Sequence, residues 1–315
     1  MSAAATPVNA VTPALDALPL EFGLSITDPR HLAQLAGEGP LLASAVAAFL
    51  GDAEVLALLP ADCAVSHLYF GSEFCEHLLP DVAELARALK LARQRALRLV
   101  LATPVANDTL LERLAELLPL LPAGSEVLAN DWGVASLVHR DFPGLRVVAG
   151  RQLSKMIKDP RLPGEQWAQL YPAGFRAERQ LRILHSLGIE RIELDVPPFA
   201  GSDFFASPGV TLALHAPYAY VAKGRLCKVG SLAQPAALKF APGGACRREC
   251  LGVVEVEGGQ PGQLGEGGKC GASRNSLRTA QRGTTMFYRY DAALLAAAAE
   301  AVRERRVSRL VLSSL

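Results

Sequence analysis

Short aliphatic and β-branched runs alternate with longer amphipathic stretches from about residue 64 onward. Runs of this kind that end at turn residues are typical of strands. The predicted strands are residues 64–70, 97–103, 126–131, 145–150, 191–197, 210–216, 253–258, 284–290 and 309–315. Strands that alternate with helices indicate a parallel sheet.

The stretches between these strands carry helix signals. Residues 81–96 place apolar side chains on one face, and residues 107–121 begin with an Asn-Asp-Thr cap. Further helices are predicted at 178–189, which ends in a glycine cap, and at 291–306, where the cations gather at the last turn. About eight strand and helix units predict an α/β fold of the TIM-like (β/α) barrel type, closed or nearly closed.

Three regions do not follow the alternating pattern. Residues 1–14 are small and uncharged and are predicted to form a disordered tail. Residues 15–62 are rich in Ala and Leu, which predicts a helical extension ahead of a barrel domain over residues 63–315 that carries the cysteine cluster. Residues 257–283 are too dense in Gly and Pro for regular structure, so a long loop is expected there.

The composition limits the classes of protein to which the chain can belong. A chain of 315 residues with 50% hydrophobic residues can bury one large core. The formal net charge of +1 gives no overall field that favours nucleic acid or anionic lipid. The first dozen residues lack the basic start and apolar run of an export signal, and no apolar run is long enough to span a bilayer. We therefore expect a cytoplasmic protein with no membrane span.

Six cysteines in such a compartment are expected to stay reduced unless they bind metal or act in redox chemistry. Cys227, Cys246 and Cys250 lie in one segment rich in Gly, Pro and cations, and the cations are expected to favour thiolates. Cys75 follows a predicted strand, as Cys227 does, and parallel α/β folds collect functional groups at the carboxyl ends of their strands. These four thiols are the predicted ligands of one metal centre.

The roles of the other two cysteines and the kind of metal have to be considered separately. Cys63 precedes a strand and is assigned to packing at the opposite rim, whereas Cys270 in the glycine-rich loop is a rival ligand. Structural zinc usually takes ligands in two local pairs, and only Cys246 and Cys250 form such a pair. The spacing therefore favours an iron-sulfur cluster over a Cys₄ zinc site, without excluding zinc.

Three segments resemble motifs of UbiV-like proteins, a branch of the collagenase-like peptidase family. They are SHLYFGSEFCEH around Cys75, EVLANDWGVASLVHRDFPGLRVVAGRQLS, and LALHAPYAYVAKGRLCKVGSL around Cys227, which a Cys-x₃-Cys pair follows. The likeness covers about residues 64–315. The stretch before residue 60 is not accounted for, and the segment between Cys227 and Cys246 is rich in Ala and Pro rather than acidic.

The resemblance implies that Cys75, Cys227, Cys246 and Cys250 hold a 4Fe-4S cluster. It further implies a role in oxygen-independent hydroxylation in ubiquinone biosynthesis, in a heterodimer with a homologous UbiU-like subunit. The implied oxygen donor is a small molecule such as prephenate. Two other functions stay open. One is a peptidase, although neither a Gly-x-Ser-x-Gly elbow nor a His-Glu-x-x-His helix is present. The other is a scaffold subunit with structural zinc.

Four further residues are weaker candidates. Asp131 reaches the rim of the barrel or caps the next helix. His215 lies near the cluster or is a satisfied core histidine, and His77 is a donor to the cluster or is exposed. Arg151 follows a strand, where its guanidinium could bind a carboxylate through two hydrogen bonds.

Overall fold

The computed structural model describes most of the chain. The described residues are 19–56, 58–60, 63–154, 158–160, 178–198, 204–205, 209–224, 226–232, 234–239, 246–257 and 277–315. Within them, no helix is both long enough and apolar enough to cross a membrane.

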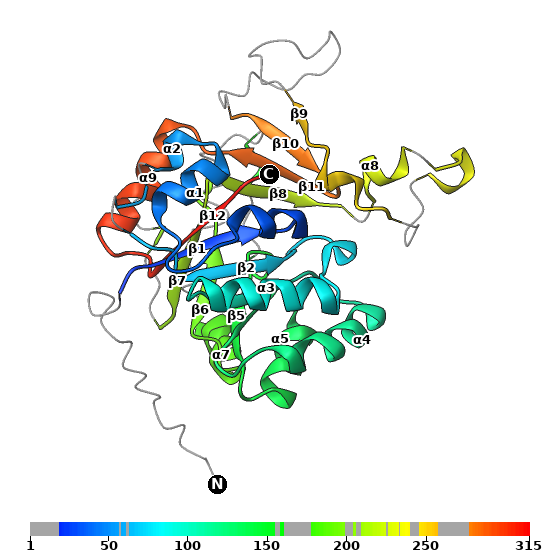
Figure 1. Cartoon of the computed structure of the whole chain (residues 1–315), viewed down its shortest axis with the longest axis horizontal. Helices are drawn as coiled ribbons and strands as arrows, with labels where there is room; N and C mark the ends of the chain where they lie inside the picture. Colours follow the sequence, from blue (N-terminus) through cyan, green and yellow to red (C-terminus); the bar gives the residue numbers. More distant parts are fainter. Residues whose placement is uncertain are drawn as a thin grey trace.

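Eight parallel strands close into a barrel, which confirms the predicted TIM-like α/β fold (Figure 1). The strands are β1 (Glu21–Ile26), β2 (His67–Gly71), β3 (Arg98–Thr103), β4 (Glu126–Ala129), β5 (Arg146–Ala149), β6 (Arg191–Leu194), β7 (Thr211–Ala216) and β12 (Arg309–Ser313). Each pairs with the next in this order, and β12 pairs with β1 to complete the ring. All carboxyl ends therefore face the same mouth of the barrel.

Side chains alternate between the two faces of the barrel wall. On β3, Val100 and Ala102 belong to a cluster inside the barrel, whereas Leu99 and Leu101 pack outward against the helices. Gly23 on β1 makes room for an interior aromatic ring, because a Cβ atom there would lie 2.6 Å from Tyr69 Cε2. The core therefore consists of a filled barrel and a surrounding layer between strands and helices.

Helices connect most of the strands and cover the outside of the barrel. They are α1 (Ala43–Leu50), α2 (Ala53–Leu56), α3 (Val82–Gln94), α4 (Asp108–Leu117), α5 (Trp132–Asp141), α7 (Glu178–Ser186) and α9 (Ala292–Arg303), while the short helix α8 (Lys228–Ser231) lies away from the barrel (Figure 1). Capping residues set their starts: Asp81 and Glu84 form a capping box at α3, and Asp291 caps α9.

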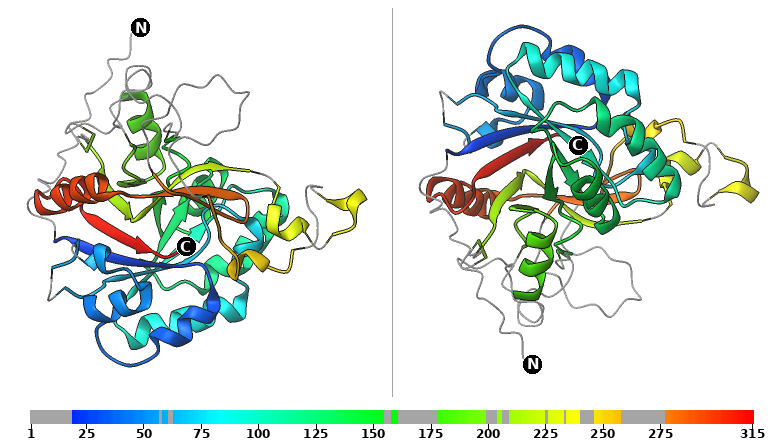
Figure 2. Two further views of the ribbon diagram at one scale, coloured as in Figure 1. Left: turned by 90° about the horizontal axis from the view of Figure 1, so that it is seen from above. Right: turned by 90° about the horizontal axis from the view of Figure 1, so that it is seen from below.

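A second sheet is inserted between β7 and β12. It is antiparallel, with the order β8 (Tyr218–Lys223), β11 (Thr285–Arg289), β10 (Thr279–Arg282) and β9 (Glu255–Glu257). Figure 1 shows this sheet lying across one end of the barrel, near the C-terminus, with α8 projecting from the body, and Figure 2 shows the same arrangement from two other directions. The insertion therefore covers the mouth at which the parallel strands end.

Several sequence-based boundaries are wrong. Residues 15–62 are not a separate helical extension, because they contain β1, which closes the barrel, followed by the 3₁₀ helix η2 (Pro29–Leu35), α1 and α2 as the crossover to β2. The barrel domain thus begins by Glu21 rather than at residue 63. The predicted tail, residues 1–14, lies outside the described residues.

The region predicted to be the last part of the barrel is also organised differently. Residues 253–258 and 284–290 do contain strands, β9 and β11, but these belong to the antiparallel sheet. The predicted loop 257–283 contains β10, which is ordered by pairing with β11 and β9. Residues 258–276 of that loop lie outside the described part of the chain.

Candidate metal centre

Two parts of the fold contribute the four predicted ligands. Cys75 follows the carboxyl end of β2 and immediately precedes the 3₁₀ helix η3 (Glu76–Leu78). Cys227, Cys246 and Cys250 come from the insertion, in which Cys227 precedes α8 and Cys250 lies in the 3₁₀ helix η6 (Glu249–Leu251). All four are free thiols.

The insertion brings its sulfurs to the Cys75 loop. Cys75 and Cys250 line the same cavity at the barrel mouth. A Cβ atom on Gly283 would lie 3.2 Å from Cys250 Sγ and 3.8 Å from Cys227 Sγ, so both sulfurs border one glycine. Burial raises the pKa of Cys75, and the nearby Cys246 and Cys227 raise it further. The four thiols therefore gather at one end of the barrel, while their binding of a metal remains a prediction.

Backbone N–H groups point at two of the sulfurs. Gly230 N donates to Cys227 Sγ at 3.2 Å, and Arg248 N donates to Cys246 Sγ at 3.3 Å. Hydrogen bonds to cysteine sulfurs are one of the means by which proteins tune iron-sulfur clusters. The same donors stabilise thiolates bound to a metal.

Arg248 holds the Cys246–Cys250 segment in place. Its backbone is left-handed, with φ 59°, and its guanidinium donates to the carbonyls of His77 and Leu79 in the Cys75 loop. It also forms an ion pair with Glu84 in α3. One side chain therefore fastens the insertion to the loop that carries the first cysteine.

The expectation that neighbouring cations would favour thiolates is wrong for Cys246 and Cys250. Burial raises the pKa of Cys75 and of Cys246, and it raises the pKa of Cys250 to about 12. Arg248 lowers the pKa of Cys246 and Arg282 lowers that of Cys250, but burial has the larger effect on both. A metal that binds these thiols must therefore displace their protons.

The fit of the thiols to a metal depends on their spacing. Within the described residues, no group of three or more His, Cys, Asp or Glu side chains is arranged to hold a metal ion. A single zinc with Zn–S bonds of about 2.3 Å would need its sulfurs only about 3.8 Å apart. A 4Fe-4S cluster binds each cysteine at a different iron, so its ligands are spread more widely. The described thiols are therefore not arranged around a single ion, and their binding of a 4Fe-4S cluster remains a prediction.

Two glycines shape this site through their backbones. Gly71 ends β2 with φ 117°, where a Cβ atom would lie 2.5 Å from the carbonyl oxygen of Ala102. Gly283 forms the turn between β10 and β11 with φ 59°, against the sulfurs of Cys250 and Cys227. A side chain at either position would change the path of the chain beside a cysteine.

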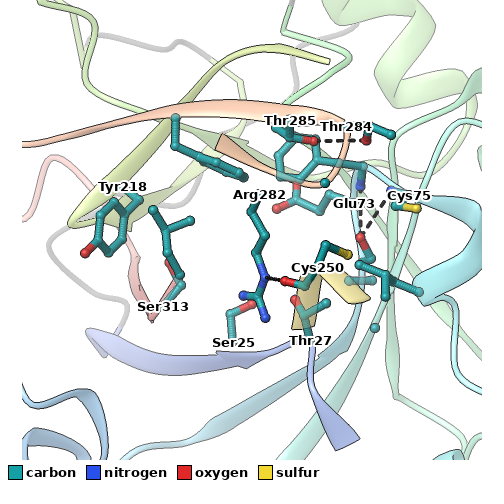
Figure 3. Close-up of a pocket in the computed structure, with 18 of the residues that line it drawn as sticks. Ser25, Thr27, Glu73, Cys75, Tyr218, Cys250, Arg282, Thr284, Thr285 and Ser313 are labelled. Atoms are coloured by element: carbon teal, nitrogen blue, oxygen red, sulfur yellow. Dashed lines mark hydrogen bonds between the residues drawn. The ribbon is translucent and has the colours of Figure 1, made fainter. Parts of the chain in front are cut away.

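A cavity lies between the barrel mouth and the second sheet, directly beside Cys75 and Cys250 (Figure 3). It holds about 670 Å³ of space free of protein atoms, its open mouth included. The ends of β1, β2 and β12 form one wall, and the β10–β11 hairpin forms the other. Its lining includes Ser25, Thr27, Phe74, Arg282, Phe287 and Ser313.

A buried network of charges lies at the same mouth. Arg151 Nε donates to Glu73 Oε1 at 2.9 Å, and its Nη1 donates to Asp195 Oδ1 at 2.8 Å. Lys158 Nζ binds the other oxygen of Asp195 at 2.5 Å. Burial opposes ionisation of both carboxyls, but Arg151 holds the pKa of each below its usual value, and Lys158 adds to this effect at Asp195.

This network corrects the expectation for Arg151. Its guanidinium is satisfied by two carboxylates within the protein, so it is not available for a ligand. Glu73, Lys158 and Asp195 were not among the sequence-predicted site residues. Glu73 lies two residues before Cys75, and Asp195 directly follows β6, so position at a strand end was the signal for both.

The remaining candidates have structural roles where they are described. Asp131 caps α5, with Oδ1 accepting from Gly133 N at 2.7 Å. His215 is buried in the barrel and bonds Glu193, although its Nδ1 has no partner among the described residues. His77 has a half-exposed side chain. Cys63 packs against the main core, as predicted, and Cys270 lies outside the described residues.

Comparisons with known proteins find weak structural similarity to chitinase-like proteins and related enzymes. No family model and no curated protein matches the chain. Among solved structures, a family 18 N-acetylglucosaminidase from Paenibacillus barengoltzii has 10% identity and a TM-score of 0.35, covering 94% of this chain and 95% of its own. A chitinase from Cycas revoluta has 11% identity and a TM-score of 0.28, covering 94% of each chain. Similarity this weak carries no inference about activity.

Proposed function

We propose that this protein holds a 4Fe-4S cluster through Cys75, Cys227, Cys246 and Cys250. We further propose that it acts with a homologous UbiU-like subunit in oxygen-independent hydroxylation for ubiquinone biosynthesis, in the cytoplasm. The observation that carries the first part is the gathering of four free thiols from the loop after β2 and from the distant insertion, two of which, Cys75 and Cys250, line one cavity. The second part rests on the sequence resemblance to UbiV-like proteins.

The cluster, when bound, would supply electron transfer or a Lewis-acidic iron to a small-molecule oxygen donor such as prephenate. The protein itself contributes three things. Backbone N–H groups are directed at the sulfurs of Cys227 and Cys246. Arg248 joins the two cysteine-bearing segments. The adjacent cavity gives a small molecule access to the sulfurs of Cys75 and Cys250.

Glycoside hydrolysis is not favoured by the carboxylates at the mouth. A glycosidase needs a carboxylic acid whose pKa is raised, so that it can protonate the leaving group. Glu73 and Asp195 are paired with Arg151, and the pKa of each is lowered. Neither carboxyl is therefore suited to be that acid.

Anaerobic purification followed by iron and sulfide analysis tests the cluster. We expect about four iron atoms per chain, with absorption and paramagnetic resonance spectra of a 4Fe-4S cluster. Serine at any one of the four positions should remove most of the iron, whereas Cys63→Ser, in the packed core, should not. A colourless protein with one zinc per chain would instead establish the structural zinc alternative.

The hydroxylation role needs a separate test. Expression of the protein with its UbiU-like homologue in cells that lack their own anaerobic hydroxylases should restore ubiquinone without oxygen. Cys250→Ser should abolish this restoration, and Cys63→Ser should retain it. A folded, cluster-loaded pair that restores no quinone would contradict the assigned pathway while leaving the cluster in place.

A further inference from the structure

Arg282 is the last residue of β10, and it lines the cavity beside the cysteines. Its Nε donates to the carbonyl oxygen of Cys250 at 3.2 Å. Its two terminal nitrogens make no hydrogen bond, and no carboxylate pairs with them, within the part of the chain that the structure describes. Figure 3 shows this side chain extending from the hairpin toward the ends of β1 and β12.

Neighbouring cations are neutralised by the protein itself. Arg151 is bound by Glu73 and Asp195, and Arg248 is paired with Glu84. The acid that raises the pKa of Arg282 is Asp28, but Asp28 is bound by Arg30 at 2.6 Å. The positive charge of Arg282 is therefore not paired with a negative side chain among the described residues.

Burial makes that charge costly. The side chain is only half exposed, and desolvation lowers the pKa of Arg282 below its usual value. Buried charges in proteins are normally paired or bind a ligand, because an isolated charge loses its hydration. We therefore expect an unpaired guanidinium in a cavity to bind an anion from outside the chain.

The other residues that line the cavity indicate which polar and apolar groups that ligand would carry. Hydroxyl groups come from Ser25 on β1, from Thr27 directly after it and from Ser313 on β12, and they can donate hydrogen bonds. Phe74 and Phe287 pack edge to face, with ring centroids 5.5 Å apart, and form an apolar side. Glu73, the acidic side chain among the described residues that line the cavity, is bound by Arg151, and the chain ends at Leu315 on the same wall without forming an ion pair with Arg282.

We propose that this cavity binds a small organic carboxylate and that the terminal nitrogens of Arg282 bind its two oxygens. A guanidinium fork matches a planar carboxylate, and one unmatched cation suits one negative charge better than a phosphate dianion. The aromatic pair would contact the apolar part of the ligand. The role of this ligand rests on the proposed function, since the ligand would lie beside the cluster cysteines.

Arg282 has an alternative role in this position. Cys250 is the first of the groups that raise the pKa of Arg282, so the cation could serve only to offset the charge of a bound cluster. In that case Arg282 would alter the reduction potential of the cluster, and carboxylates would bind no better to the wild type than to a variant without this charge.

Titration calorimetry on the full-length, anaerobically purified protein separates these roles. The probes are benzoate and phenylpyruvate, with neutral benzamide and inorganic phosphate for comparison. The variants are Arg282→Gln and the matched control Arg278→Gln, which removes an exposed arginine of the same segment that does not line the cavity. We expect at least one carboxylate to bind the wild type and Arg278→Gln, and to bind Arg282→Gln about 10- to 100-fold more weakly.

Four outcomes would overturn the proposal. They are failure of both carboxylates to bind the wild type, equal binding to Arg282→Gln, tighter binding of phosphate or benzamide, and a shift in cluster potential in Arg282→Gln without a loss of carboxylate affinity. Iron analysis of the same samples separates this proposal from the cluster. If carboxylate binding depends on Arg282 in a protein that contains no iron, the carboxylate site is supported and the cluster is contradicted. If the protein contains iron but binds no carboxylate, the cluster is supported and the carboxylate site is contradicted.

Discussion

Arg248 Nη1 lies 2.7 Å from Glu84 Oε1, so a residue between two of the cysteines is anchored to the first turn of α3. We expect Arg248→Met to lower the free energy of unfolding by about 1–2 kcal/mol, because it removes this ion pair and two bonds to carbonyls. It should also speed the release of iron to a chelator. Arg247→Met, which replaces an exposed neighbour, is the control. Equal rates of iron release in the two variants would show that the anchor does not hold the metal site.

Arg151→Met should be far more damaging than a surface substitution. It leaves the buried carboxylate of Glu73 without a cation, and we expect a loss of about 3–5 kcal/mol in urea unfolding. The double variant Arg151→Met with Glu73→Gln should recover part of that loss, because it no longer buries the unpaired charge. Arg140→Met, at an exposed ion pair with Asp141, should have no measurable effect. If the double variant were as unstable as the sum of its single changes, the pair would not be coupled.

Gly283→Ala and Gly124→Ala separate backbone strain from contact with the cysteines. Both glycines have positive φ, so each alanine should cost about 1–2 kcal/mol. Only the Cβ atom at residue 283 would meet the sulfurs of Cys250 and Cys227, whereas the one at residue 124 has nothing within 4 Å. We therefore expect reduced iron content in Gly283→Ala alone. Full iron content in that variant would place the hairpin turn outside the metal site.

His67 makes stability depend on pH at the other end of the barrel. Burial, and then the Arg309 guanidinium, lower the pKa of His67 to about 4. Arg309 Nη2 lies 2.8 Å from His67 Nε2, which must be unprotonated to accept this bond. Since the unfolded chain takes up the proton first, stability should fall by roughly 3 kcal/mol as the pH drops from about 6.5 to about 4. Urea unfolding across this range checks the slope, and His67→Gln should flatten it relative to the wild type.

The parts of the fold that the sequence revealed are those with local signals. Most barrel strands have buried aliphatic runs, and helices such as α3 have clear caps. Strand β1 was missed because it contains Gly23 and Ser25, which are weak strand formers. Gly23 is needed only because the Tyr69 ring fills the space in front of it. The second sheet was missed because its pairing partners β8 and β11 are far apart in the sequence.

The candidate site was also predictable from the sequence only where the signals were local. Cys75 could be placed because it follows a strand, and the insertion cysteines could be placed because they share one segment. Which arginine is free could not be predicted, since that depends on where the carboxylates lie in space. Arg151 is neutralised by Glu73 and Asp195, from two other strand ends, whereas Arg282 on the hairpin is not.

The insertion between β7 and β12 returns the chain to the barrel through α9, and the four proposed ligands lie in this insertion and in the loop after β2, outside the ring of barrel strands. If the proposed cluster is bound there, its loss to oxygen would affect the insertion and the Cys75 loop, while the closed ring of strands keeps its shape. The same folded polypeptide would then be able to take up fresh iron and sulfide.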